Sequence, residues 1–292
     1  MIDPFGTAAL RAALLTAWES SPTRLREDAA LEADLVRAGY RDRVFTELAQ
    51  NAADAARQVD VEGELEVWLD GRELHVANTG APLTVEGVQA LSAMRASAKG
   101  TVGTVGRFGV GFTAVLACAD EVEIRSTSGS ICFSAERTRR ELAGLLERGG
   151  VHRAPVLRLV WPSDARPAAG FDTEVVLVVR DGIDATALLD SARCEAVDLL
   201  LELPALHRIT IADKSLERVT TRRSNGLAEI RIGEQTWWCR GTAQHRWLVP
   251  QSGGEVHPVG VDVLRAPTRS DEALSLPAIL VCDVAMQPDR RR

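Results

Sequence analysis

Three polar side chains recur one helical turn apart in the segment ELAQNAAD: Glu47, Asn51 and Asp54. At ~100° per residue they fall within about 60° of one another around a helix. Asn51 can ligate Mg²⁺, which prefers oxygen ligands and is commonly shared with phosphates. Glu47 can then orient or deprotonate a water molecule. Taken alone, the same residues also fit an ordinary solvated helix face.

A glycine-rich segment, GRFGVGFTAVL from Gly106 to Leu116, precedes and opens a helical pattern. Because glycine has no Cβ, phosphate oxygens can approach the backbone, and the N-terminus of a helix offers free N–H groups and a favourable dipole. The pattern predicts a buried helix from Phe108 to Ala119. The alternative is a flexible loop followed by close helix packing.

Two short segments beside strand patterns suit a nucleotide base. Asn78, in the turn Asn78-Thr79-Gly80, can accept a hydrogen bond from an exocyclic amine such as that of adenine, and Gly80 lets a base lie close to the backbone. Thr173, in the segment GFDTEV, can place a hydroxyl beside the same base. Singly, these segments also fit a strand-ending turn and plain strand propensity.

The elements that must position these residues are a helix and a hairpin. Val44, Phe45 and Leu48 begin an apolar helical face that starts near Asp42. Two strands, 64–70 and 72–77, are joined at Asp70-Gly71, a hairpin signal. A short helix is expected after Thr84, and 97–106 is expected to be a mobile loop.

The rest of the chain predicts more helices and strands around them. Ser21-Pro22 begins a helix that runs toward Ala38. Further helices are expected at 138–148 and 185–203. Strands are expected at 121–126, 131–135, 156–160, 174–179, 208–212, 228–232, 236–240, 260–264 and 279–284.

We therefore expect an α+β protein in which one layer of helices covers a mixed or antiparallel sheet. A composition shift near Asp181-Gly182 predicts two domains, 1–182 and 183–292. The second domain is expected to be smaller and truncated, because its strands arrive without helices to cover them.

Composition narrows the class of protein. The net charge of −7 argues against non-specific nucleic-acid binding, which usually needs a basic face. The five cysteines are scattered, odd in number and lack a CxxC pair, which fits a reducing cytoplasm better than a disulfide framework or a zinc site. No signal peptide is visible and no apolar run approaches the ~20 residues needed to span a bilayer, so no membrane partner is expected.

The four segments in this order resemble the GHKL ATPases, which include gyrase B, heat-shock chaperones, histidine kinases and MutL. The stretch GRFGVGFTAVLACADEVEIRS is most similar to the ninety-kilodalton heat-shock chaperones and to the sacsin-like ATP-binding module of bacteria. The resemblance covers roughly Arg24 to Arg180. It implies a two-layer Bergerat ATP-binding fold, ATP or ADP as the ligand, and Mg²⁺.

The resemblance also implies roles for individual residues. Glu47 would be the general base, Asn51 the Mg²⁺ ligand, and Asp54 the acidic residue near the base and its waters. Asn78 and Thr173 would share the adenine contact, with Gly80 below the base. The segment 97–106 would be the lid and 106–112 would hold the phosphates. The other residues expected to bind ATP are Leu83, Ser97, Lys99, Gly106, Arg107, Phe108, Gly109, Val110, Gly111 and Phe112.

Two positions depart from the family. Asn78 stands where the family usually has an aspartate, so a contact with the base loses its charge assistance. Pro82 replaces the second glycine of that motif, which fixes φ and removes an N–H. Weaker or altered base recognition follows as a hypothesis.

These residues suggest three hypotheses about function. The first is a slowly ATP-hydrolysing conformational switch with chaperone-like action. A homodimer is one oligomeric state considered for its full-length form. The second is a nucleotide-binding regulatory module without significant hydrolysis. The third is a DNA-handling ATPase of the gyrase or MutL sort, which the acidic charge balance and the FGVGF form count against. The client and partner proteins are not indicated.

Overall fold

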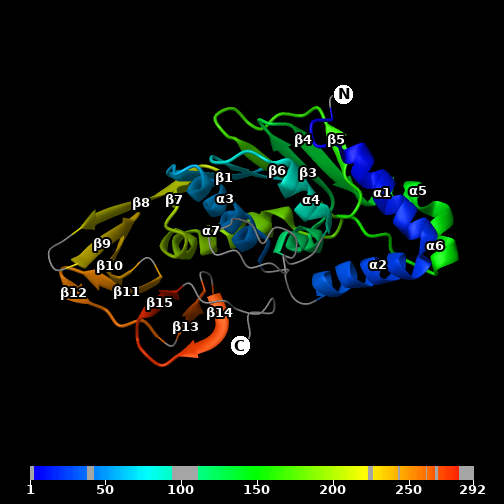
Figure 1. Ribbon diagram of the computed structural model, residues 1–292. Helices are drawn as coiled ribbons and strands as arrows, with labels where there is room; N and C mark the ends of the chain where they lie inside the picture. The colour runs from blue at the N-terminus through cyan, green and yellow to red at the C-terminus, as the bar shows by residue number, and fades with distance from the viewer. Residues whose placement is uncertain are drawn as a thin grey trace.

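A computed structural model describes residues 3–37, 43–93, 111–222, 226–242, 244–260, 262–266 and 269–282. The chain is a mixed α/β protein with a large mixed sheet, which confirms the predicted combination of helices with such a sheet (Figure 1). The more specific Bergerat sandwich stays a prediction.

Among the described residues the strands form one continuous sheet, in the order β14-β13-β15-β11-β10-β9-β8-β7-β1-β2-β6-β3-β4-β5, with β12 beside β11. In its first half, β7 pairs parallel with β1 and the other pairs are antiparallel. The strands of this half are β1 (Gly63–Asp70), β2 (Glu73–Asn78), β3 (Ala119–Ser126), β4 (Ser130–Ser134), β5 (Trp161–Ser163), β6 (Thr173–Val179), β7 (Leu206–Ile211) and β8 (Lys214–Arg222).

The second half of the sheet extends from β8 into the C-terminal part of the chain. The expected strands there are confirmed, while β8, β11, β12 and β14 were not predicted from the sequence. The strands are β9 (Leu227–Ile232), β10 (Gln235–Gly241), β11 (His245–Ser252), β12 (Glu255–Val256), β13 (Asp262–Arg265), β14 (Arg269–Leu274) and β15 (Ile279–Cys282).

The helices cover the first half of the sheet and extend beyond its edge strand (Figure 1). Helices α3 and α7 pack against β1 and against each other. Helix α1 packs on β5 and α2, α5 packs on β3, β4 and α6, and α2 packs on α6 and η2. Their bounds are α1 (Thr7–Ser20), α2 (Pro22–Arg37), α3 (Val44–Gln58), α4 (Val85–Ala93), α5 (Ala135–Glu141), α6 (Ala143–Gly149) and α7 (Ala185–Glu202), with a 3₁₀ helix, η2, at Gly111–Ala117.

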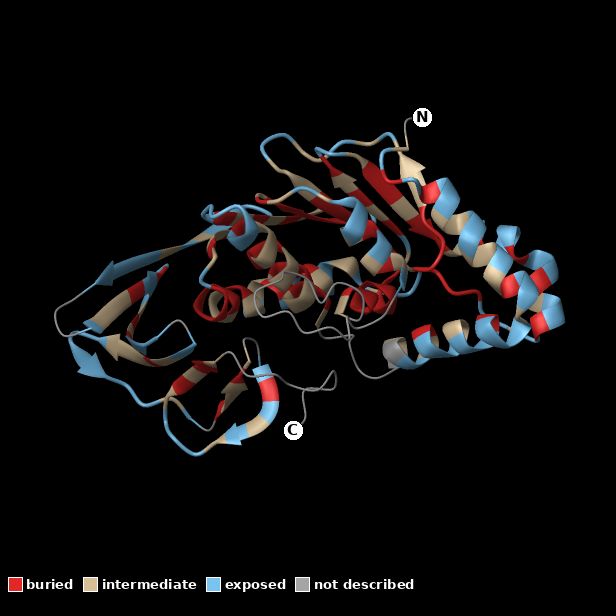
Figure 2. Ribbon diagram, in the orientation of Figure 1, coloured by how far each residue is buried: buried red, intermediate tan, exposed pale blue. Residues whose placement is uncertain are grey.

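Helix α3 is positioned by its apolar face. Val44, Phe45, Leu48 and Ala52 recur at helical spacing and are buried against the sheet, so the polar residues between them are directed elsewhere. Figure 2 shows this division, with buried residues on the inner side of the helices and along the central strands. The orientation of α3 thus follows from hydrophobic burial.

The predicted boundary between 182 and 183 stays a prediction, and the structure adds one fact to it. Helix α7 and strand β7 lie after that boundary, yet β7 pairs with β1 and α7 packs on α3. One hydrophobic core contains Leu48 and Leu65 as well as Leu199 and Ile209. The first half of the sheet and the helices packed on it therefore contain residues from both sides of position 182.

Three local predictions were wrong. The segment 156–160 is a buried loop, because Val156 and Leu157 donate their N–H groups to the side chain of Glu32 and not to a neighbouring strand. The helix expected at 138–148 is two short helices, α5 and α6. The described part of the helix expected from Phe108 is the 3₁₀ helix η2, since a short apolar run carries too little periodicity to distinguish the two.

Candidate functional site

Helix α3 carries the three polar residues predicted to act together. Glu47, Asn51 and Asp54 are all partly buried, so they lie at the boundary between the core and the surface. Asp54 forms an ion pair with Arg57 at 3.0 Å. Burial raises the pKa of Asp54 and the neighbouring Arg57 opposes that shift. The Asp54 carboxylate is therefore paired with a residue of its own helix. The row of predicted polar residues continues along α3 toward Glu47.

Gly111 lies directly against the carboxylate of Glu47. A Cβ atom added to Gly111 would come within 2.1 Å of Glu47 Oε2. No larger residue fits there unless Glu47 moves. The structure thus brings the start of η2, which was predicted to hold phosphates, beside the residue that was predicted to activate water.

Asn51 offers an uncommitted carboxamide one turn further along α3. Its side chain makes no hydrogen bond among the described residues. No group of three or more His, Cys, Asp or Glu side chains in the described ranges could hold a metal ion. A magnesium ion here would take one amide oxygen from the protein and its other ligands from phosphates and water, which is a common arrangement for Mg²⁺. The residues present fit that ion only together with a polyphosphate.

The residues predicted to recognise a base lie side by side at the ends of neighbouring strands. Asn78, the last residue of β2, is paired in register with Thr173, the first residue of β6. Asn78 is only 8% exposed. Its Nδ2 donates to the carbonyl oxygen of Thr79 at 3.1 Å, and among the described residues none donates to its Oδ1. Asn78 Oδ1 is not among the described side-chain atoms that are buried without a partner, so it can accept a hydrogen bond from a ligand or water.

Ser126, at the end of β3, completes this row and was not predicted from the sequence. It pairs in register with Thr173 and is fully buried. Its Oγ accepts a hydrogen bond from the N–H of Leu83 at 3.0 Å and donates to the carbonyl of Asp172 at 3.0 Å. Since the single hydroxyl hydrogen of Ser126 is used on Asp172, the donor in the 3.5 Å contact between Ser126 and Thr173 is the Thr173 hydroxyl.

Gly80 ties the base end of the site to helix α3. Its φ is +130°, and an added Cβ would lie 2.6 Å from backbone atoms of Ala55 and Ala56. The next residue, Ala81, donates its N–H to the carbonyl of Ala55 at 2.9 Å. This position requires glycine both for its backbone conformation and for the close approach to the helix.

The structure brings Gly111 against Glu47, Asn78 beside Thr173, and Gly80 against the end of α3, and it leaves other predicted residues undescribed. Phe112, next to Gly111, is buried in the core, and Leu83 is bound through its backbone to Ser126. The predicted residues that lie outside the described ranges are Ser97, Lys99, Gly106, Arg107, Phe108, Gly109 and Val110.

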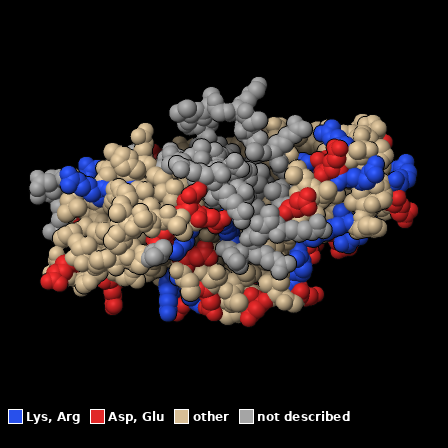
Figure 3. Space-filling view, turned by 90° about the horizontal axis from the view of Figure 1, so that it is seen from below, with Lys and Arg blue, Asp and Glu red and all other residues tan. Residues whose placement is uncertain are grey.

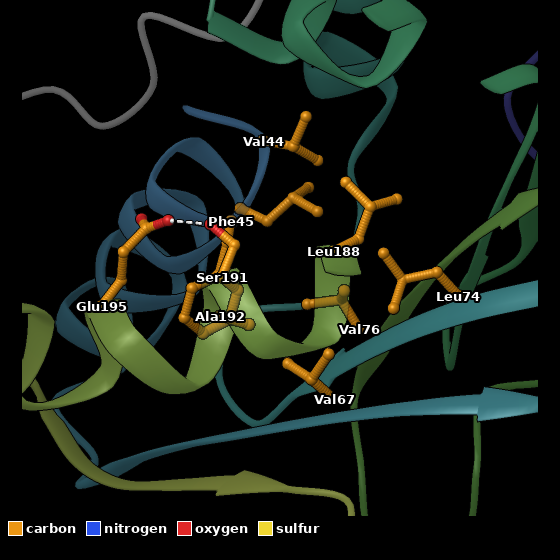
Figure 4. A pocket seen from close by; sticks show the side chains of 10 residues that line it. Val44, Phe45, Val67, Leu74, Val76, Leu188, Ser191, Ala192 and Glu195 are labelled. Atoms are coloured by element: carbon orange, nitrogen blue, oxygen red, sulfur yellow. Dashed lines mark hydrogen bonds between the residues drawn. The ribbon is translucent and has the colours of Figure 1, made fainter. Parts of the chain in front are cut away.

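Two hollows lie near these residues in the described part of the chain. One is a cavity of about 30 Å³ between α3, the sheet and α7, where Ser191 donates to Glu195 (Figure 4). It is large enough for about one water molecule and not for a nucleotide. The other, of about 200 Å³, lies outside the Thr79-Gly80 turn and is lined by Glu62, Glu64 and Asp172. Its carboxylates would repel phosphate groups.

No family model matches the chain, and no curated protein matches it. Among the described helices, none is both long enough and apolar enough to cross a membrane.

Proposed function

We propose that the protein binds ATP with Mg²⁺ and hydrolyses it slowly, as a conformational switch of the GHKL type with chaperone-like action. The observation that carries this proposal is the pairing of two contacts along one helix. Glu47 meets Gly111 near the start of α3, and Gly80, which follows the Asn78–Thr173 pair, packs on the end of the same helix.

The base end of the site supports adenine. Asn78 Oδ1 is an acceptor without a donor among the described residues, which suits the exocyclic amine of adenine. The Thr173 hydroxyl could donate to a ring nitrogen in place of its long contact of 3.5 Å with Ser126. A clear preference for GTP over ATP in a binding titration would contradict this assignment.

The other end supports water activation. The partly buried carboxylate of Glu47 lies against the backbone of Gly111, so a water bound by that carboxylate beside this contact would be close to a terminal phosphate bound at the start of η2. Mg²⁺, bound by Asn51, would supply charge neutralisation to the phosphates. Glu47 would orient that water and accept its proton.

Replacing Glu47 tests the enzymatic part of the proposal. Glu47→Ala is expected to retain ATP affinity within about threefold and to lower turnover by 10²-fold or more, because general-base catalysis contributes about that much. Calorimetry measures the binding and phosphate release measures the turnover. Glu86→Ala is the matched control, since Glu86 is an exposed carboxylate in the first turn of α4 as Glu47 is in the first turn of α3.

The same experiment distinguishes the second candidate function. If the wild type binds ATP but its hydrolysis does not exceed that of Glu47→Ala, the protein is a nucleotide-binding module and not an ATPase. That alternative draws support from Asn78, which lacks the charge of a carboxylate. Absence of any heat of association with ATP or ADP in the presence of Mg²⁺ would end both proposals.

The surface gives little support to a DNA-handling ATPase. On the described part of the face in Figure 3, Lys and Arg side chains are interspersed with Asp and Glu and do not form a continuous basic stripe. Non-specific DNA affinity depends on such a stripe and falls steeply with salt. A salt-dependent gel shift with duplex DNA would favour this function.

A further inference from the structure

One peptide unit, between Thr79 and Gly80, is held at both of its polar ends. Its N–H, from Gly80, donates to Asp172 Oδ2 at 2.9 Å. Its C=O, from Thr79, accepts from Asn78 Nδ2 at 3.1 Å. Because the N–H and C=O of a trans peptide point in opposite directions, fixing one of them fixes the other.

Asp172 is itself held firmly by the neighbouring strands. Its N–H donates to the carbonyl of Asn78 at 3.0 Å, and its carbonyl accepts from Thr127 N–H and from Ser126 Oγ, each at 3.0 Å. These hydrogen bonds therefore restrain the backbone of Asp172, from which the carboxylate extends. The carboxylate accepts from the Gly80 N–H and offers no hydrogen of its own while it is ionised.

We propose that Asp172 is the positioning residue that orients the amide of Asn78, an inference that rests on the proposed nucleotide function. Asp172 directs the Gly80 N–H toward itself, the Thr79 carbonyl then turns toward Asn78, and Asn78 Nδ2 is drawn onto that carbonyl. Asn78 Oδ1 is left directed away from the turn as an acceptor. An asparagine needs this control because its amide has a donor and an acceptor side that can exchange places by rotation.

The consequence is a preference between bases. With Oδ1 presented, the site accepts a hydrogen bond from the exocyclic amine of adenine. With the amide reversed, Nδ2 would be presented and would suit the O6 acceptor of guanine. Asp172 thus determines specificity without touching the base.

The test is the ratio of ATP to GTP affinity, measured by calorimetry with Mg²⁺. Asp172→Ala is expected to lower that ratio about tenfold, the worth of one hydrogen bond in a binding constant. Asp172→Asn keeps an oxygen that can accept from Gly80 and should stay within about threefold of the wild type. Asp172→Leu, similar in size to aspartate but without an acceptor, should behave like Asp172→Ala and serves if the alanine variant does not fold.

Two controls distinguish a change in the orientation of the Asn78 amide from a general disturbance of the structure. Asp184→Ala also removes a carboxylate that accepts backbone N–H bonds, at the start of α7, and should leave the ratio unchanged. In an Asn78→Asp background, Asp172→Ala should no longer change the ratio, because a carboxylate presents an acceptor in either orientation. An unchanged ratio in Asp172→Ala, or an equal fall in the Asn78→Asp background, would overturn the proposal.

Hydrogen exchange distinguishes failure of this inference from failure of the proposed function. In the wild type without nucleotide, the Gly80 amide and the Asn78 side-chain amide should exchange slowly. Exchange as fast as at the exposed Asp213 turn would overturn the inference whether or not nucleotide binds. Slow exchange together with no affinity for either nucleotide would support the orientation and reject the nucleotide function.

Discussion

At the scale of single residues, we expect substitution of Gly111 to affect ATP turnover more than the stability of the fold. An added methyl group would meet the end of the flexible Glu47 side chain, which can move aside. We expect Gly111→Ala to change the free energy of unfolding by less than about 1 kcal/mol, yet to lower ATP turnover at least tenfold, because small displacements of a catalytic group are costly. Urea unfolding and phosphate release measure the two effects.

Gly144→Ala is the matched control for that change. Gly144 lies in α6, where an added Cβ meets nothing within 4 Å. Alanine should stabilise that helix by about 0.5–1 kcal/mol and leave turnover unchanged. Turnover of Gly111→Ala equal to that of the wild type would show that Glu47 does not act at this contact.

Residues of the site differ in how far the sequence could predict them. Asn78 and Thr173 were predicted from their places beside strand patterns, and the register between β2 and β6 brings them together. Ser126 and Asp172 were missed, because serine and aspartate at strand ends are common and carry no local signal. Their role depends on contacts with residues 40 or more positions away.

At the scale of elements, Glu32 joins α2 to the loop before β5. Its carboxylate is 4% exposed and accepts the N–H groups of Val156 and Leu157 at 2.8–3.0 Å. Glu32→Ala would leave two buried N–H groups unpaired, so we expect a loss of about 2 kcal/mol in the free energy of unfolding. Chemical denaturation at neutral pH measures it.

Glu27→Ala on the same helix is the control, since Glu27 is exposed. It should change the free energy of unfolding by no more than about 0.5 kcal/mol. Equal effects of the two substitutions would show that the buried hydrogen bonds of Glu32 contribute nothing.

The same contact explains why the strand expected at 156–160 was wrong. The apolar residues there suggested a strand, but burial on all sides also suits a loop packed inside the protein. A distant side chain satisfies the backbone N–H groups that a sheet would otherwise use. Helix α2, by contrast, begins at the predicted Pro22, because its start signal is local.

At the scale of the whole molecule, a partly buried ionic cluster joins α7 to the last strands. Glu202 pairs with Arg265 at 3.0 Å, Arg265 also pairs with Asp198 and Asp262, and Arg269 bridges those two aspartates. From β11, Arg246 donates to the carbonyl of Glu202. Three carboxylates share two arginines in this group, so one negative charge is in excess when all three carboxylates are ionised.

Burial raises the pKa of Glu202 to about 8, and Asp198 adds to the shift while Arg265 and Arg269 oppose it. A carboxyl whose folded-state pKa is raised contributes stability that is complete below its unfolded pKa and is lost as the pH rises through the folded pKa. The wild type should therefore lose stability between about pH 5 and pH 8, with a slope from this group of at most about 1.4 kcal/mol per pH unit.

Glu202→Gln tests that pH dependence. The variant should resemble the wild type near pH 5, where Glu202 is protonated, and become the more stable of the two near pH 8.5. Urea unfolding across this range measures the difference. Parallel pH profiles of the two proteins would show that Glu202 does not titrate in this window.

The sequence by itself determined the features that depend on nearest neighbours along the chain. These are the amphipathic face of α3, the hairpin at Asp70-Gly71, the glycine at position 80 and the spacing of Glu47, Asn51 and Asp54. Only the tertiary structure decided the parallel pairing of β1 with β7, the contact of Gly111 with Glu47, and the hold of Asp172 on the Thr79-Gly80 peptide. Periodicity, capping and turn chemistry act over a few residues, whereas these contacts join segments that only the packing of a common core brings together.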